Sequence, residues 1–278
     1  MKVKDYTPLI GSMQCSPALH RSSGDSCLSK EARARIDRAY ARSTRKNRVK
    51  GGSEYVRIKE APVDASEKKD LIKTFFRPEK PSSWEKKPHE WLDSNNIADV
   101  LDQYEEADAT FEFIGPVPID FAKNTGYGSC IVNELCKLNL KEAYAKGTRK
   151  IGIVFNLDEH DKPGSHWMCA YIDVPGADHE GAVYYFDSYG MKPPTRIADF
   201  MKKCGDQGCT TLLYNDIRMQ KKNSECGMYC LYCLICLMRG KSFPEVCESA
   251  IDDDTMIAFR DVLFVSDTST PTIEKTCI

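Results

Sequence analysis

The central part of the chain contains short apolar runs that are separated by polar turns. Three of them, residues 150–156, 166–173 and 182–187, are rich in β-branched and aromatic side chains and have the length of strands. The connection between the last two contains Pro175 and Gly176 and is short enough for a hairpin. The pattern therefore predicts a central antiparallel sheet made of these three strands.

Helical segments accompany these strands in the sequence. Residues 228–238 form an almost continuous apolar run that ends at Arg239 and Gly240, which predicts a buried helix with a basic last turn and a glycine stop. Apolar spacing and helix-forming residues predict other elements: helices at 94–104, 134–145, 195–203 and 252–264, a last strand at 210–215 and an edge or irregular segment at 111–121. This mixture indicates an α+β fold with a central antiparallel sheet flanked by helices.

Composition narrows the class of protein. The 278 residues include 39 Lys and Arg against 41 Asp and Glu. The resulting net charge of −2 does not indicate that the molecule as a whole binds nucleic acid. No apolar run has the length of a membrane span, and no apolar signal segment follows Met1. With no secretion signal, the 13 cysteines are expected to be reduced thiols in a cytosol-like compartment.

One cysteine stands where a polar loop becomes a helix. Cys226 precedes Gly227 and the apolar run, so its sulfur is expected at the positive end of a helix dipole, a place that favours the nucleophilic thiolate. A thiol nucleophile needs a base, a group that orients the base and a donor for the oxyanion. His166 opens one predicted strand and Asp187 closes the next, and Gln220 lies shortly before the cysteine. Each alone also fits a structural role, such as a satisfied polar histidine or a turn-capping aspartate.

In this order, the residues resemble the clan of the SUMO (ubiquitin-like-protein) proteases and the adenovirus protease. The shared motifs are His-Trp at the start of a strand, Asp at the end of the next, and Gln-x5-Cys-Gly at a helix start; the stretch Trp91-Leu92-Asp93-Ser94-Asn95-Asn96-Ile97 resembles the element that opens the catalytic domain of that clan. The resemblance covers about Trp84 to Phe264. The long N-terminal arm and the stretch Ser26 to Lys30 are most similar to the polyprotein-processing proteases of large DNA viruses of the asfarvirus kind.

The resemblance implies a role for each of four residues: His166 as base, Asp187 as its orienter, Cys226 as nucleophile and Gln220 in the oxyanion hole. It also implies that Trp91 and Trp167 clamp a diglycine, since two facing indoles leave room for backbone without Cβ atoms. The alternative is that both tryptophans are core residues. The expected function is a cysteine endopeptidase that cleaves after Gly-Gly-type motifs, with a polypeptide substrate from a viral polyprotein or capsid precursor.

The other cysteines are not expected to bind a metal. Cys230, Cys233 and Cys236 lie on one unbroken apolar helix with no histidine nearby, so small buried thiols explain them better than a zinc site does. Cys204 and Cys209 are a better metal or redox candidate, but no second pair accompanies them, and a plain loop is favoured. Neither a metal nor a cofactor is therefore expected.

Residues 1–83 resemble nothing in the SUMO proteases and are expected to form a basic, partly helical arm before a catalytic domain at 84–278. Ser29 predicts the start of a helix. The basic segment 30–50 is expected to be a solvated face, with nucleic acid or an acidic partner as the alternative. Gly51-Gly52-Ser53 predicts a linker or, alternatively, a site of self-cleavage, and residues 54–87 predict a hinge.

Three other functions fit parts of the same pattern. A deSUMOylating or deubiquitinating isopeptidase shares the catalytic residues, whereas an acyltransferase shares the Cys-His pair but needs a coenzyme pocket, and no glycine-rich phosphate loop is present. A nucleic-acid or scaffold-binding protein would use the basic segment instead. A viral enzyme is expected in the virion and the host cytoplasm and any other in the cytoplasm or nucleus, neither secreted nor bound to a membrane.

Overall fold

The computed structural model describes residues 14–19, 26–43, 53–177 and 179–267. The chain forms two compact units: the core unit, residues 89–256, and the N-terminal unit, residues 1–88 together with 257–278. The predicted division into an arm and a catalytic domain stays a prediction; the compact units divide at residue 88, and the last residues of the chain join the N-terminal unit. None of the described helices has the length and apolar character needed to cross a bilayer.

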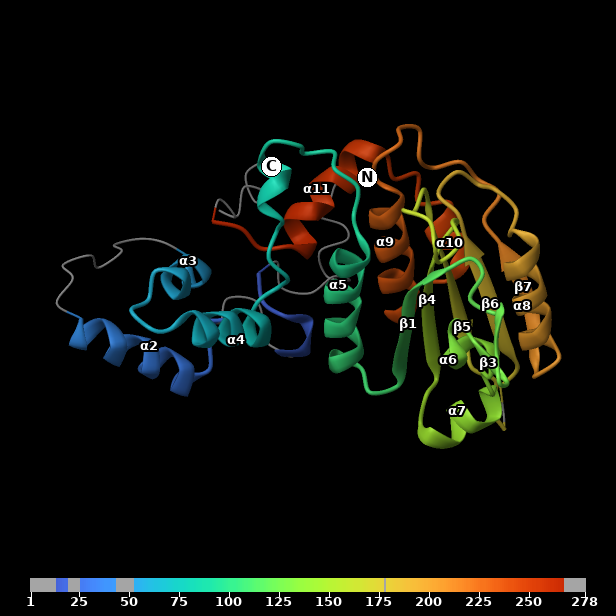
Figure 1. Ribbon diagram of the computed structural model, residues 1–278, viewed down its shortest axis with the longest axis horizontal. Helices are drawn as coiled ribbons and strands as arrows, with labels where there is room; N and C mark the ends of the chain where they lie inside the picture. Colours follow the sequence, from blue (N-terminus) through green and yellow to red (C-terminus); the bar gives the residue numbers. More distant parts are fainter. Residues whose placement is uncertain (1–13, 20–25, 44–52, 178, 268–278) are drawn as a thin grey trace. The chain divides into compact units, whose positions relative to one another are not determined.

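The core unit is built on a five-stranded mixed sheet (Figure 1). The strand order is β1-β4-β5-β6-β7, with the bounds Phe111–Pro118, Lys150–Asn156, Trp167–Asp173, Gly181–Phe186 and Cys209–Tyr214. The central pairs β4–β5 and β5–β6 are antiparallel, whereas the edge strands β1 and β7 run parallel to their neighbours. The predicted α+β class with a central antiparallel sheet is therefore confirmed, and the structure adds two parallel edges.

Two helices cover one face of this sheet, α9 (Cys226–Met238) on β4 and β5 and α5 (Ser94–Ala107) on β1 (Figure 1). All 13 residues of α9 are buried, as its apolar run predicted. The strands approach it closely: a Cβ on Gly152 of β4 would lie 3.5 Å from the Leu234 side chain of α9. The helix that begins with Cys226 is thus a central part of the core.

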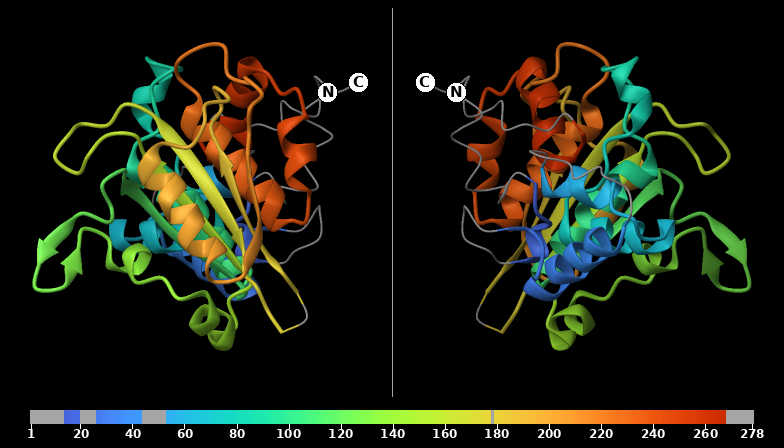
Figure 2. Two further views of the ribbon diagram at one scale, coloured as in Figure 1. Left: turned by 90° about the vertical axis from the view of Figure 1, so that its right-hand side faces the viewer. Right: turned by 90° about the vertical axis from the view of Figure 1, so that its left-hand side faces the viewer.

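The other face packs against α6 (Asn133–Cys136), α7 (Leu140–Lys146) and α8 (Thr195–Gly205) (Figure 2). The single helix predicted at residues 134–145 is wrong, because the Asn139 side chain accepts a hydrogen bond from the Glu142 N–H (3.1 Å) and starts a new helix. A hairpin of β2 (Asn124–Gly126) and β3 (Ser129–Cys130) stands away from the main sheet (Figure 2). Helix α10 (Phe243–Cys247) packs against α9.

The N-terminal unit is helical, with α2 (Lys30–Arg42), α3 (Glu54–Lys59), α4 (Ala65–Phe75) and the short η2 (Pro17–Leu19) and η3 (Ser82–Glu85). Helix α11 (Asp253–Leu263) runs from the core unit into it. Ser29 caps α2 as predicted, since its hydroxyl accepts a hydrogen bond from the Ala32 N–H (3.1 Å). Ser53 and Asp64 cap two further helices within residues 54–87, and the role of this segment as a hinge stays a prediction.

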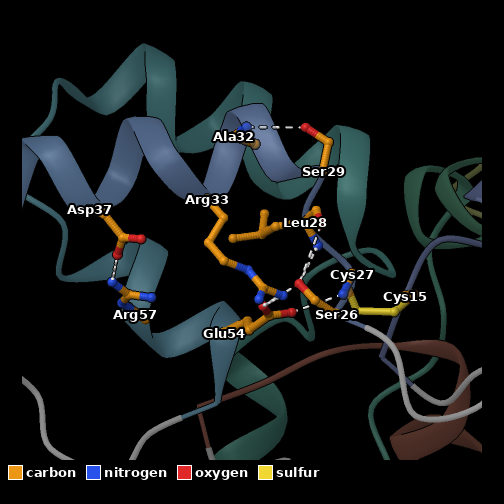
Figure 3. A network of polar contacts seen from close by, with 10 residues as sticks. All are labelled: Cys15, Ser26, Cys27, Leu28, Ser29, Ala32, Arg33, Asp37, Glu54 and Arg57. Carbon is orange, nitrogen blue, oxygen red and sulfur yellow. Dashed lines mark hydrogen bonds and ion pairs between the residues drawn. A yellow bond between two sulfur atoms is a disulfide. The ribbon is translucent and has the colours of Figure 1, made fainter.

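Glu54 is the centre of a polar network in this unit (Figure 3). Its carboxylate accepts hydrogen bonds from the Ser26 hydroxyl, the Cys27 N–H (2.8 Å) and the Arg33 guanidinium (3.2 Å). Arg35 of the same basic helix pairs with Glu67 (2.7 Å). Part of the predicted basic segment is thus neutralised within the unit, and its binding to nucleic acid stays a prediction. Gly51 and Gly52, the proposed self-cleavage site, lie outside the described residues.

Two disulfides correct the expectation that all cysteines are reduced. Cys15 is bonded to Cys27, and Cys130 is bonded to Cys136. Both pairs are close in sequence, with separations of 12 and 6 residues, and their Cα atoms lie 5.1 and 6.6 Å apart. The other eight described cysteines are free and buried.

Candidate active site

Cys226 is the first residue of α9 and is 3% exposed. The loop before it is fixed by the Asp253 carboxylate, which accepts hydrogen bonds from the N–H groups of Lys221 (2.9 Å) and Lys222 (3.0 Å). No side chain caps the start of the helix. The first backbone N–H groups and the positive end of the helix dipole are therefore free to act on negative charge that develops near the Cys226 sulfur.

The pairing of β5 and β6 places an imidazole against a carboxylate. His166 directly precedes β5 and Asp187 directly follows β6, and the antiparallel register, with Cys169 opposite Phe186, brings these two ends together. The His166 Nε2–H donates to the Asp187 Oδ1 at 3.0 Å. The second ring nitrogen, Nδ1, is thereby left available for the Cys226 side chain, which acts on the imidazole and raises its pKa.

The surroundings of His166 favour its charged form. Burial of the imidazole by itself lowers its pKa, but the hydrogen bonds and negative charges of Asp187 and Cys226 outweigh burial and raise the pKa of His166 to about 9. At neutral pH the imidazole is therefore protonated, and it can stabilise a thiolate and later give its proton to a leaving amine.

Gln220 lies in the loop between β7 and α9 and is fully buried. Its amide oxygen accepts a hydrogen bond from the Ser188 hydroxyl (2.6 Å), and the Ser188 carbonyl accepts one from the Gln220 N–H (2.9 Å). In this arrangement the Nε2 group of the Gln220 side chain has no hydrogen-bond partner among the described residues. A buried, preorganised N–H donor with no partner is suited to an oxyanion that forms only during a reaction.

Tyr189 connects the base to the loop of the nucleophile. Its ring stacks on His166 with 5.0 Å between centroids, its N–H donates to the Asp187 Oδ1 (2.8 Å), and its hydroxyl donates to the Lys222 carbonyl (3.0 Å). The Arg218 guanidinium lies over the ring of Tyr189, 5.4 Å from the ring centroid. The His166 imidazole is thus held at its face by the Tyr189 ring and at its edge by the Asp187 carboxylate.

The two tryptophans differ in their surroundings. Trp167 is buried, and its Nε1–H donates to the Leu92 carbonyl (2.8 Å), whereas Trp91 is 46% exposed. Gly227, next to the nucleophile, lies against both Leu92 and Trp167, and a Cβ there would come within 3.1 Å of the leucine side chain. Trp91, Trp167 and His166 all line one cleft of about 460 Å³. The core explanation therefore fits Trp167 in part, but not Trp91.

The structure brings the predicted residues together in the core unit: His166 is hydrogen-bonded to Asp187, Cys226 acts on His166 and raises its pKa, and the two tryptophans line the same cleft as His166. Their catalytic roles stay predictions. Sequence reasoning missed Ser188 and Tyr189, which directly follow the aspartate; no pattern marks them, because the bonds of their hydroxyls to Gln220 and Lys222 join residues 32 and 33 positions apart. Among the described residues, no group of three or more His, Cys, Asp or Glu side chains could hold a metal ion.

Comparison with known proteins finds that the chain is similar to viral proteases. No protein-family model matches the chain. A protein of Acanthamoeba polyphaga mimivirus, named as a thiol protease, is 29% identical over 218 residues, which are 76% of this chain and 67% of the relative. An African swine fever virus protein named as a SUMO-1 cysteine protease is 28% identical over 129 residues, 44% of this chain and less than half (46%) of the relative.

The fold has a counterpart of known structure. The crystal structure of an African swine fever virus protease matches with a TM-score of 0.69 at 21% identity and covers 91% of this chain and 95% of that one. The chain is therefore related in sequence to viral cysteine proteases and has the fold of the African swine fever virus enzyme. The resemblance predicted from the sequence is confirmed.

Proposed function

We propose that this chain is a cysteine endopeptidase that cuts polypeptides after Gly-Gly-type motifs during the processing of a viral precursor. One observation carries the proposal: Cys226 at the start of α9 and Asp187 both act on His166 and raise its pKa, and His166 is hydrogen-bonded to Asp187. A thiol, a base and an orienting carboxylate in this order are what nucleophilic acyl transfer requires. The names of the relatives support the viral thiol-protease class.

Each group has one step in the reaction. The Cys226 thiolate attacks the carbonyl carbon of the second glycine. The oxyanion that forms accepts hydrogen bonds from the Gln220 Nε2–H and from backbone N–H groups at the start of α9. His166 gives its proton to the departing amine, which leaves an acyl-enzyme. The neutral imidazole then takes a proton from water, which attacks the thioester and releases the acid. Asp187 keeps the imidazole in the tautomer that faces the sulfur.

The preference for glycine follows from the space near the nucleophile. Gly227 already lies against Trp167 and Leu92, and Trp91 lines the same cleft. A substrate segment that passes between the two indoles has little room for Cβ atoms, so two glycines fit where larger residues meet aromatic rings.

The test is the cleavage of short peptides. The wild-type protein is expected to cut internal Gly-Gly-X peptides after the second glycine, with the site located by mass spectrometry, and the Cys226→Ala variant should cut none. The His166→Ala variant should be nearly inactive, and Asp187→Ala should lose less. A Cys226→Ala variant with full activity would exclude the assignment.

A second candidate function is removal of a ubiquitin-like modifier, which the name of the African swine fever virus relative favours for that protein. A deconjugating enzyme requires the folded modifier, so it should cut linear SUMO or ubiquitin fusions and leave the short peptides intact. Parallel digestion of both substrate sets therefore separates the two functions.

A further inference from the structure

The loop of residues 221–225 joins the proposed oxyanion donor, Gln220, to the proposed nucleophile, Cys226. It belongs to no helix or strand, and residues 221–223 are exposed. Packing of buried side chains therefore does not hold the first part of this loop. Its position depends on the hydrogen bonds of its main chain.

One carboxylate binds this main chain. The Asp253 Oδ2 accepts hydrogen bonds from both the Lys221 N–H (2.9 Å) and the Lys222 N–H (3.0 Å). Lys222 is fastened a second time at its carbonyl, which accepts a hydrogen bond from the Tyr189 hydroxyl (3.0 Å). Hydrogen bonds to a carboxylate are stronger than those between neutral groups. The two residues that follow Gln220 are therefore held by Asp253 and Tyr189.

Asp253 is not needed to begin its own helix. The preceding residue caps α11, since the Asp252 side chain accepts a hydrogen bond from the Thr255 N–H (2.8 Å). Asp253 is only 4% exposed, and its second oxygen, Oδ1, has no hydrogen-bond partner among the described residues. The nearby Tyr229 hydroxyl donates to the Ile251 carbonyl (3.1 Å). Because burial of a half-satisfied carboxylate costs stability, stabilisation of the helix does not explain this residue.

The position of Gln220 decides whether its Nε2–H reaches the oxyanion. A donor has to lie about 3 Å from the developing charge, and a shift of about 1 Å removes much of its effect. On one side Gln220 is fixed to Ser188, whose carbonyl accepts its N–H (2.9 Å). On the other side, the next two N–H groups are those that Asp253 binds. Loss of this carboxylate would therefore release one side of the donor, while Cys226 stays in α9.

We propose that Asp253 is a positioning residue of the reaction, which acts through the main chain of Lys221 and Lys222 to direct the Gln220 Nε2–H at the oxyanion. The inference rests on the proposed function and adds a residue to it. The oxyanion exists only in the transition state and the intermediate that follows it. Loss of Asp253 should therefore lower kcat and leave KM nearly unchanged.

The experiment removes the acceptor and the charge separately, with a Gly-Gly-X peptide as substrate. Asp253→Ala should lower kcat by about tenfold or more, up to the 10²–10³ expected for Gln220→Ala, with KM within about twofold of the wild type. Asp253→Asn keeps an oxygen that can accept the same two N–H groups, so it should retain kcat within about threefold.

The matched control is Asp254→Ala, which removes a carboxylate from the next residue of the same helix. Asp254 is paired with the Lys222 Nζ (2.6 Å), but its side chain is 79% exposed. An exposed ion pair contributes little, so this variant should have the kcat and KM of the wild type.

Alkylation of Cys226 by iodoacetamide separates positioning of the donor from a general disturbance of the site. In this reaction the thiolate displaces iodide, and no oxyanion forms. The rate in Asp253→Ala, followed by mass spectrometry of the peptide that contains Cys226, should therefore stay within about twofold of the wild type. An alkylation rate that falls together with kcat would overturn the proposal, because Asp253 would then support the sulfur and its base as well.

A second measurement needs no variant. In the wild type, the amide hydrogens of Lys221 and Lys222 should be protected from exchange about tenfold more than that of Asn223, as measured by NMR. Equal protection at the three positions would overturn the proposal, as would full kcat in Asp253→Ala or an equal loss in Asp253→Asn. No cleavage of any Gly-Gly peptide by the wild type would instead count against the proposed function itself.

Discussion

Removal of the Ser188 hydroxyl tests how the oxyanion donor is oriented. In the structure this hydroxyl donates a 2.6 Å hydrogen bond to the amide oxygen of Gln220, and both residues are buried. In Ser188→Ala the amide oxygen of Gln220 loses this hydrogen bond, which anchors the side chain in the observed orientation. The Nε2 group is then no longer directed at the oxyanion in every molecule.

The expected magnitude follows from that one bond. A buried hydrogen bond of this kind contributes about 1–1.5 kcal/mol, which corresponds to a fall in kcat of about tenfold. The loss is bounded by complete removal of the donor in Gln220→Ala, for which we expect roughly 10²–10³ in kcat. KM should stay nearly unchanged, since the bond concerns a charge that forms only in the transition state.

The assay is steady-state cleavage of a Gly-Gly-X peptide by four proteins: wild type, each single variant and the double variant. The Ser188→Ala change should alter kcat by less than about twofold when Gln220 is already alanine, because then no amide remains to be oriented. Ser249→Ala, which removes another serine hydroxyl bond (2.7 Å, to the Val246 carbonyl), is the control and should keep full kcat. Full activity of Ser188→Ala, or the same tenfold loss in the Gln220→Ala background, would refute the reasoning.

Three further predictions concern pH, selectivity and the cleft. Asp187 and Cys226 raise the pKa of His166 to about 9 against the effect of burial, so the charged imidazole stabilises the fold fully below about pH 6.5. This contribution to the free energy of unfolding, up to about 3 kcal/mol, should disappear as the pH rises from about 6.5 to about 9. Urea unfolding of the wild type should show the loss, and urea unfolding of His166→Gln should not. Trp91→Ala should reduce the kcat/KM preference for Gly-Gly over Ala-Ala about tenfold, and an unchanged ratio would exclude the clamp. Asp120→Asn should weaken the hydrogen bonds of Asp120 to His160, which lines the cleft, and raise KM severalfold with little change in kcat, as measured on the same peptides.

The main elements of the fold could be predicted because their signals are local. An apolar run follows Cys226 and predicted α9, and runs of β-branched and aromatic residues next to His166 and Asp187 predicted the two strands. The order of the candidate residues along these elements therefore followed from the sequence. The interruption between α6 and α7 was missed because it depends on one capping side chain, Asn139, within a helix-forming segment.

Other features depend on contacts that no local pattern contains. The bond of Ser188 to Gln220 joins residues 32 positions apart, and the ion pair of Glu159 with Arg196 of α8 joins residues 37 positions apart. The disulfides require particular Cα atoms to lie close together, which spacing alone does not show. Sequence could therefore name the candidate catalytic residues, but not the groups that orient them.

Cys226, the proposed nucleophile, begins a helix whose 13 residues are all buried. Backbone amides in such an element exchange their hydrogens with solvent through large openings and not through local fraying. Motion that displaced the sulfur from the imidazole would then have to disrupt the hydrophobic core as well. Loss of activity and loss of protection from exchange in α9 should therefore coincide on heating. A partly unfolded molecule would then be inactive and would not cut other proteins.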